Sequence, residues 1–273
     1  MLLLVHHTRA ALDVVFRVLR VPPLASVWLC ALSLSCLTAC NSTYNCWGPH
    51  CYGTAAWDGQ SPSVISLEAT VKLVPLNGGD GFVDDEVWVI DRNDTNCTNV
   101  TQNIFNLCWI ELGAVAGPAW FPNDSATHLF WAENRPTSPG NPSAFFFHTL
   151  ANPSSGELSS HVDYAITRDA RPVSGNGWII AATTSSNQYV ATTTNSMTPP
   201  TSIEIGQELY GSSGASAPKA DFAATAVGTD AGVWDNNEVT TDGNVTSDNP
   251  PNGSWQLSPT KGGGGIFITQ CCQ

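Results

Sequence analysis

The sequence is poor in charged residues, and most of those it has are acidic. Charged residues make up only 12% of the 273 positions, and ten lysines and arginines stand against 23 aspartates and glutamates. A formal net charge of −13 repels phosphate backbones, so the composition argues against nucleic acid as a partner. A carboxylate-rich surface with little lysine suits an extracellular setting that is acidic enough to protonate some of these groups.

Several kinds of functional site are also missing. Cysteines and histidines do not recur at zinc-ligand spacing, and His128, His148 and His161 show no triad spacing. The glycine run Gly262–Gly265 lacks the lysine and serine of a phosphate-binding loop, so we expect a hairpin loop there. The segment Gly211–Gly214 lacks the nucleophile-elbow pattern. The sequence therefore predicts neither a metal nor a cofactor.

The remaining pattern is that of an all-β protein. Gly, Pro, Ser, Thr and Asn are abundant, and beyond the N-terminus no stretch keeps a helical period. Short alternating segments separated by turns are typical of an antiparallel jelly-roll β-sandwich. We expect one such domain over residues 61–273, preceded by a cysteine-containing lead segment at 40–60. Its strands are expected at 54–58, 63–76, around Trp88, Glu111 and Trp131, and at 144–150, 159–167, 177–183, 202–210, 222–228 and 265–269.

The N-terminus reads as a targeting segment. Arginines at positions 9, 17 and 20 precede an apolar run over 24–37, which is short for a membrane span but suits a signal peptide. Residues 1–39 are therefore predicted to direct export, with the mature protein secreted. Leu37, Thr38, Ala39 and Cys40 resemble a bacterial lipobox, in which the cysteine carries a lipid anchor. An ordinary cleaved signal with an incidental cysteine is the alternative.

Nine cysteines in an exported chain indicate disulfides. Removal of the signal and assignment of Cys40 to the lipid leave six of them. The local pairs Cys46 with Cys51 and Cys97 with Cys108 each close a short loop and are the predicted bonds. The adjacent Cys271 and Cys272 cannot be assigned from the sequence.

Glutamate occupies one strand face in four stretches, and in three of them tryptophan shares that face. The period of two places them opposite aliphatic residues in 86–90, 108–112, 129–133 and 203–209. Solvated strand faces usually carry Thr, Ser and Lys instead. We therefore expect a shallow acidic cleft that Trp88 and Trp131 wall, with Glu86 and Glu133 at its rim.

These stretches resemble the neprosin-type glutamic peptidases. The similarity lies in the order of Phe82–Ile90, Cys108–Gly113, Leu129–Trp131, Asn176–Ile180 and Gly206–Leu209. Trp88–Asp91 and Ile110–Gly113 are similar to motifs of the fungal glutamic peptidases as well. The resemblance implies a concanavalin-like jelly roll, a polypeptide substrate, and a catalytic pair formed by Glu111 and a second glutamate. The neprosin pattern selects Glu208 and the fungal pattern favours Glu204, and the sequence does not decide between them.

The chemistry of such a pair can be argued from the residues alone. Hydrolysis of a peptide needs one group to take a proton from water and another to protonate the leaving amine. Two close carboxyls cannot both ionise cheaply, so one stays protonated at mildly acidic pH and the roles divide. The chain is thus predicted to be a secreted glutamic endopeptidase that acts at acidic pH. We also expect it to be a monomer.

Other interpretations of the same residues stay open. Glu111 could pair with Arg92 or Arg135 across the sheet, and the tryptophans, Trp178 above all, could be core residues. A glycoside hydrolase also uses two carboxylates flanked by tryptophans. A non-catalytic carbohydrate-binding or cell-surface module, with a polysaccharide as partner, is the further alternative.

Overall fold

The computed structural model describes most of the chain beyond residue 49. The described residues are 50–57, 63–73, 75–91, 97, 107–136, 145–154, 156–169, 177–197, 200–210, 215–216, 220–229, 234–235, 244–249, 255–259 and 266–270. All of them belong to one compact unit, Ser42–Gln273. The predicted signal segment 1–39, Cys40, Cys46, Cys271 and Cys272 lie outside the described residues.

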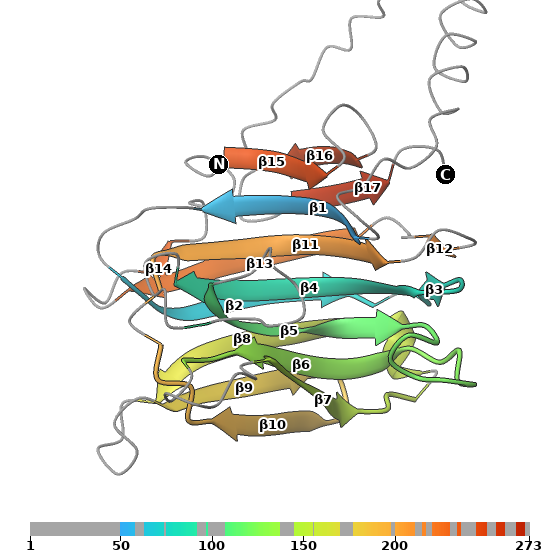
Figure 1. The fold of residues 1–273 in the computed structure, drawn as a ribbon, viewed down its shortest axis with the longest axis horizontal. Helices are drawn as coiled ribbons and strands as arrows, with labels where there is room; N and C mark the ends of the chain where they lie inside the picture. The colour runs from blue at the N-terminus through green and yellow to red at the C-terminus, as the bar shows by residue number, and fades with distance from the viewer. Residues whose placement is uncertain are drawn as a thin grey trace, which may run out of the picture. The chain divides into compact units, whose positions relative to one another are not determined.

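The first of two large sheets has seven antiparallel strands (Figure 1). In spatial order they are β15 (Asn244–Asn249), β1 (His50–Trp57), β11 (Ser202–Tyr210), β4 (Phe82–Asp91), β5 (Cys108–Ala116), β6 (His128–Asn134) and β7 (Phe145–Ala151). The central strands β4 and β5 are consecutive in sequence, whereas β11 comes from much later in the chain. Their side-by-side pairing brings distant carboxylates onto neighbouring strands.

The second sheet is also antiparallel and packs against the first. Its order is β10 (Gln188–Thr193), β9 (Gly177–Thr183), β8 (His161–Asp169), β2 (Val64–Lys72), β13 (Ala220–Thr229), β17 (Ile266–Gln270) and β16 (Trp255–Pro259), and β14 (Trp234–Asp235) pairs with β13. A small pair joins β3 (Asn77–Gly78) to β12 (Ala215–Ser216), and the 3₁₀ turn η1 (Glu157–Ser159) precedes β8. The predicted all-β sandwich is confirmed.

The two sheets differ in what covers their outer faces. In the second sheet, β2 alternates between core residues such as Leu67 and Val71 and exposed ones such as Glu68 and Lys72. In the first sheet, every residue of β4, β5 and β6 is buried. One face of these strands joins the core between the sheets, and the other lies under a separate aromatic cluster. We call this outer face of the first sheet the site face.

Several predicted elements match the observed ones. The predicted bounds of β9 and β11 are those of the structure, whereas β1 begins four residues before the expected strand. The predicted disulfide between Cys97 and Cys108 is confirmed, with the two Cα atoms 5.2 Å apart. The glycine run at 262–265, predicted to be a hairpin loop, lies outside the described residues. Among the described residues, no helix is long and apolar enough to span a membrane.

Candidate active site

The strand register places Glu111 on the site face. Glu111 of β5 is paired with Trp88 of β4, which is paired in turn with Glu204 of β11, so the three side chains share one face. Two strand spacings separate the Cα atoms of Glu111 and Glu204 by roughly 10 Å. The indole of Trp88 therefore stands between the two glutamates.

Glu86 lies two residues before Trp88 and has glycine on both sides. Its partners across the sheet are Gly113 of β5 and Gly206 of β11. A Cβ atom added to Gly113 would lie 3.0 Å from the Cα of Glu86, and one added to Gly206 would lie 2.5 Å from the carbonyl oxygen of Gly53. No side chain therefore flanks Glu86 along this row of the sheet.

Asp84 and Glu208 form the next row of the site face. They are paired across β4 and β11, and the backbone N–H of Glu208 donates a 2.9 Å hydrogen bond to Oδ1 of Asp84. Tyr52 of β1 is the partner of Glu208 on its other side. Asp84 is not among the predicted site residues, although the same period of two that links Trp88 to Glu86 continues to it.

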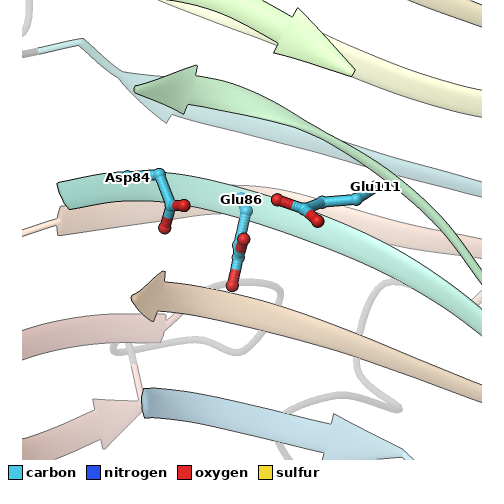
Figure 2. A group of neighbouring side chains, drawn as sticks. All are labelled: Asp84, Glu86 and Glu111. Atoms are coloured by element: carbon cyan, nitrogen blue, oxygen red, sulfur yellow. The ribbon is translucent and has the colours of Figure 1, made fainter. Parts of the chain in front are cut away.

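Three of these carboxyls meet closely. Oxygen atoms of Asp84, Glu86 and Glu111 all lie within 4.8 Å of one another, and the side chains turn to the same side of β4 (Figure 2). Asp84 is 2% exposed, Glu86 1% and Glu111 6%. Buried carboxyl oxygens this close together can share protons. We call Asp84, Glu86, Glu111 and Glu208 the acidic cluster.

Burial dominates the protonation of the cluster. It raises the pKa of Glu86 well above its ordinary value, and the charge of Glu111 raises it further. Burial also raises the pKa of Glu111, although a hydrogen bond from Glu86 offsets part of this rise. The pKa of Asp84 is raised by burial first and then by the charges of Glu86 and Glu208. The cluster therefore keeps protons at pH values where ordinary carboxyls have lost them.

The described basic side chains lie elsewhere. Lys72 and Arg168 are on β2 and β8 of the second sheet. Arg135 lies 3.7 Å from Glu133 and 4.0 Å from the ring centre of Phe146. The alternative in which Arg135 pairs with Glu111 is therefore wrong, and Arg92 lies outside the described residues.

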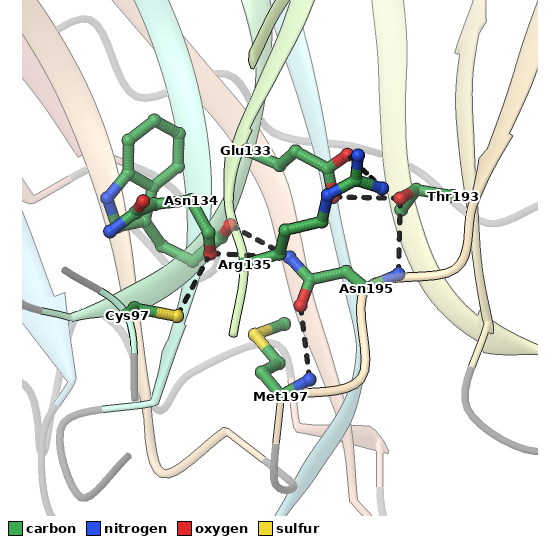
Figure 3. Close-up of polar contacts among 8 residues, drawn as sticks. Cys97, Glu133, Asn134, Arg135, Thr193, Asn195 and Met197 are labelled. Carbon is green, nitrogen blue, oxygen red and sulfur yellow. Dashed lines mark hydrogen bonds and ion pairs between the residues drawn. The ribbon is translucent and has the colours of Figure 1, made fainter. Parts of the chain in front are cut away.

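Glu133 is not at the rim of a cleft. It is 2% exposed and accepts a 2.8 Å hydrogen bond from the hydroxyl of Thr193, on β10 of the second sheet (Figure 3). The nearby Asn195 is also buried, and its side-chain amide donates to the carbonyl oxygens of Trp109 and Asn134. These bonds tie the first sheet to the segment that follows β10, so Glu133 has a structural role.

Trp131 also lies on the other face. Its cross-strand partner is Leu112, and it belongs to the core between the two sheets, where it stacks on His148 with ring centres 4.1 Å apart. The prediction that Trp131 walls the same cleft as Trp88 is therefore wrong. Trp109, which is not among the predicted site residues, stacks on Trp88 on the site face, with ring centres 5.5 Å apart. Trp178, 1% exposed, is a core residue as expected.

An aromatic side chain from a loop covers part of the site face. Trp120, in the connection between β5 and β6, stacks on Phe147 of β7 with ring centres 4.2 Å apart. The same indole contacts Phe82 of β4 at 5.8 Å. Because β5 and β6 lie between β4 and β7, Trp120 spans the face that carries Glu111. The acidic cluster is therefore an enclosed site.

Known proteins resemble this chain in fold, whereas no match is found by sequence. No protein-family model matches this sequence, and no curated protein matches it. Two solved structures that resemble the fold are scytalido-glutamic peptidase with a transition state analog inhibitor, and the same peptidase with a peptide-based transition state analog. The first has a TM-score of 0.55 and 12% sequence identity, the second 0.50 and 13%. Each match covers 83% of this chain and 100% of the peptidase.

In its fold, the chain is thus similar to glutamic peptidases. At this identity the likeness concerns the fold, and function has to be argued from the site. The match spans the whole peptidase chain, so the resemblance is not limited to a few strands.

Proposed function

We propose that this protein is an acid-acting glutamic endopeptidase in which Glu111 activates water. The observation that supports this most strongly is the enclosed cluster of buried carboxyls around Glu111, on the site face of a sandwich that resembles glutamic peptidases. Carboxyls that cannot all ionise divide into proton acceptors and proton donors, which is the requirement of acid–base hydrolysis.

In this proposal Glu111 is the general base. It takes a proton from water as the water oxygen bonds to the carbonyl carbon of the substrate. The second carboxyl then gives a proton to the amide nitrogen as the C–N bond breaks, leaving a free acid and an amine. Stacked Trp88 and Trp109 would contact the substrate beside the reacting bond.

Glu208 is the preferred second carboxyl. Its negative charge raises the pKa of both Glu86 and Glu111, so it belongs to the same electrostatic cluster. Glu204 lies on the row of Trp88, which separates it from Glu111. If Glu208 is the proton donor, Glu208→Gln should lose activity and Glu204→Gln should retain more of it.

Cleavage of a denatured protein at about pH 3–5 tests the proposal. The wild-type chain should cut the substrate, and Glu111→Gln should lower the rate by about 100-fold or more. Glu68→Gln is a matched control, because Glu68 is an exposed residue of β2 in the second sheet. Equal cleavage by wild type and Glu111→Gln would remove Glu111 from the mechanism. A wild-type protein that binds polysaccharide and cuts nothing would contradict the peptidase proposal.

Export is proposed on the sequence pattern alone. A signal peptide over residues 1–39 and a lipid on Cys40 would place the enzyme outside the cytoplasm, anchored to the cell surface. Intact-mass spectrometry of the mature protein tests both parts. A chain that begins at Cys40 and carries the mass of a lipid supports the anchor, and an unmodified start at another residue contradicts it.

A further inference from the structure

We infer that Glu86 is the positioning partner of Glu111: it holds a proton and donates it in a hydrogen bond to the Glu111 carboxylate. This inference rests on the proposed function and adds a third carboxyl to it. The two side chains come from adjacent strands, and their oxygens lie within the 4.8 Å cluster that Figure 2 shows. From the sequence alone, Glu86 is expected at the rim of the cleft.

The position of Glu86 is specific to this role. It lies diagonally across β4 and β5 from Glu111, and diagonally across β4 and β11 from Glu208. Its direct cross-strand partners, Gly113 and Gly206, have no side chains. No side chain of these two residues can therefore lie between Glu86 and Glu111, or between Glu86 and Glu208. Glu204 and Glu208 are each two strands from Glu111. Among the described residues, Glu86 is therefore the site-face glutamate on a strand adjacent to that of Glu111.

The polar surroundings of Glu86 explain why it should keep the proton. Its side chain is 1% exposed, and the indole N–H of Trp88 lowers its pKa by less than burial and the charge of Glu111 raise it. A buried carboxylate with so little donor support is costly, whereas a protonated carboxyl needs only an acceptor. Glu111 supplies that acceptor.

The titratable groups that face Glu86 add no positive charge close to it. On the site face they are Asp84 of β4, Glu111 of β5, Glu204, Glu208 and Tyr210 of β11, Tyr52 of β1 and His128 of β6. His128 is two strands from β4, stacks on Phe121 and contacts Asn152 at 2.6 Å. The negative charge of the cluster thus has to be limited by protons, and Glu86 is at its centre.

The consequence for catalysis is indirect, because Glu86 acts through Glu111. A proton on Glu86 lets Glu111 stay ionised and fixes the orientation of its carboxylate while it accepts the proton of water. Nothing is consumed, since Glu86 keeps its proton through the cycle. At higher pH the shared proton is lost and two adjacent carboxylates repel each other, so activity should fall.

Three variants test the role of Glu86. Glu86→Gln keeps a hydrogen-bond donor that cannot ionise, so it should stay within about tenfold of wild-type kcat/KM, and its alkaline limb should move to higher pH. Glu86→Leu removes the donor and should lower kcat/KM by about 100-fold at every pH. Glu68→Gln should leave the pH profile unchanged. A Glu86→Leu variant with the wild-type profile, or an unshifted limb in Glu86→Gln, would overturn the inference.

A spectroscopic measurement separates this inference from the proposed function. Carbon-13 NMR of the labelled glutamate carboxyls should show Glu86 and Glu111 titrating together in wild type, and Glu111 titrating at lower pH in Glu86→Gln. This result is independent of turnover, so it remains valid if the protein cuts no peptide. An unchanged Glu111 titration in Glu86→Gln contradicts the shared proton, even if Glu111 is essential for activity.

Discussion

Gln207 donates a 2.6 Å hydrogen bond from Nε2 to Oδ1 of Asp85, within the space between the two sheets. Asp85 is fully buried, and its second oxygen has no hydrogen-bond partner among the described residues. Burial raises the pKa of Asp85 to about 7, although the bond from Gln207 opposes this rise. A carboxyl of this kind is neutral in the folded protein over the acidic range in which the unfolded chain has already ionised it.

Stability should therefore fall as pH rises between the unfolded and folded pKa values of Asp85, from about 4 to about 7. The folded state binds more protons in this window, and a shift of that size corresponds to at most on the order of 4 kcal/mol. Asp85→Asn should remove this part of the dependence and be the more stable protein at pH 7. Urea denaturation across the window measures it. Asp163→Asn, at an exposed position of β8, should keep the wild-type slope.

The contribution of Glu157 to stability should change with pH in the opposite direction to that of Asp85. Its carboxylate accepts hydrogen bonds from Asn187, Ser154, Thr184 and Tyr189, and these bonds, that of Asn187 first, lower its pKa to about 2. The stability that it contributes is present above its ordinary pKa and is lost only as pH falls toward 2. Glu157→Gln should cost about 1–3 kcal/mol at pH 5 and progressively less below pH 4.

Thermal unfolding of Glu157→Gln at a series of pH values checks this, with Glu68→Gln as the exposed control. If the difference in stability between wild type and Glu157→Gln stays constant down to pH 2, the prediction that the Glu157 carboxylate is ionised is contradicted. The expected result has a functional meaning, since Glu157 holds the β9–β10 hairpin to η1 at the pH where a glutamic peptidase would work.

Gly206→Ala should destabilise the site strand. Its Cβ would lie 2.5 Å from the carbonyl oxygen of Gly53 and 2.6 Å from Cγ2 of Thr54, so β1 or β11 would have to shift. We expect a loss of about 1–3 kcal/mol or more. Gly156→Ala is the control, because the nearest atom to its Cβ is the Ser154 hydroxyl at 3.9 Å. Equal denaturation midpoints for both variants would show that the first sheet tolerates a side chain at 206.

The Cys97–Cys108 disulfide should stabilise the start of β5. It closes a loop of 11 residues' separation, for which chain entropy gives about 3 kcal/mol. Replacement of both cysteines by alanine should lower the free energy of unfolding by about that amount and leave the active site assembled at low temperature. Denaturation and activity of the double variant test this. A loss of activity without loss of stability would mean that the bond positions Glu111 directly.

The strands of the site could be predicted because tryptophan or glutamate alternates with aliphatic residues in 86–90, 108–112 and 203–209. The pattern of β11 and the pair of Trp88 with Glu111 on one face follow from the period of two. The same period of two also places Asp84 on this face. The place of Glu86 between two glycines could not be predicted, because it depends on the register of β4 with both β5 and the distant strand β11.

The errors come from strands buried on both sides. In β6 all seven residues are buried, so the alternation of polarity that assigns a face is lost, and Trp131 and Glu133 were placed on the wrong one. Trp120 carried no signal at all, since a tryptophan in a loop indicates nothing about the strands that it will cover. Its contacts with Phe82 and Phe147 exist only once the loop closes over the sheet.

The cover that Trp120 forms has a kinetic consequence. Within this connection the N–H groups of Trp120 and Phe121 bond to Gly117, and the N–H of Ala119 bonds to the carbonyl of Gly81, just before β4. Opening of the segment would break the bond to Gly81 and the ring contacts of Trp120 while both sheets stay intact, at a lower cost than global unfolding. A polypeptide would reach Glu111 only during such excursions, so the frequency of opening, rather than bond cleavage, would set the upper limit on turnover.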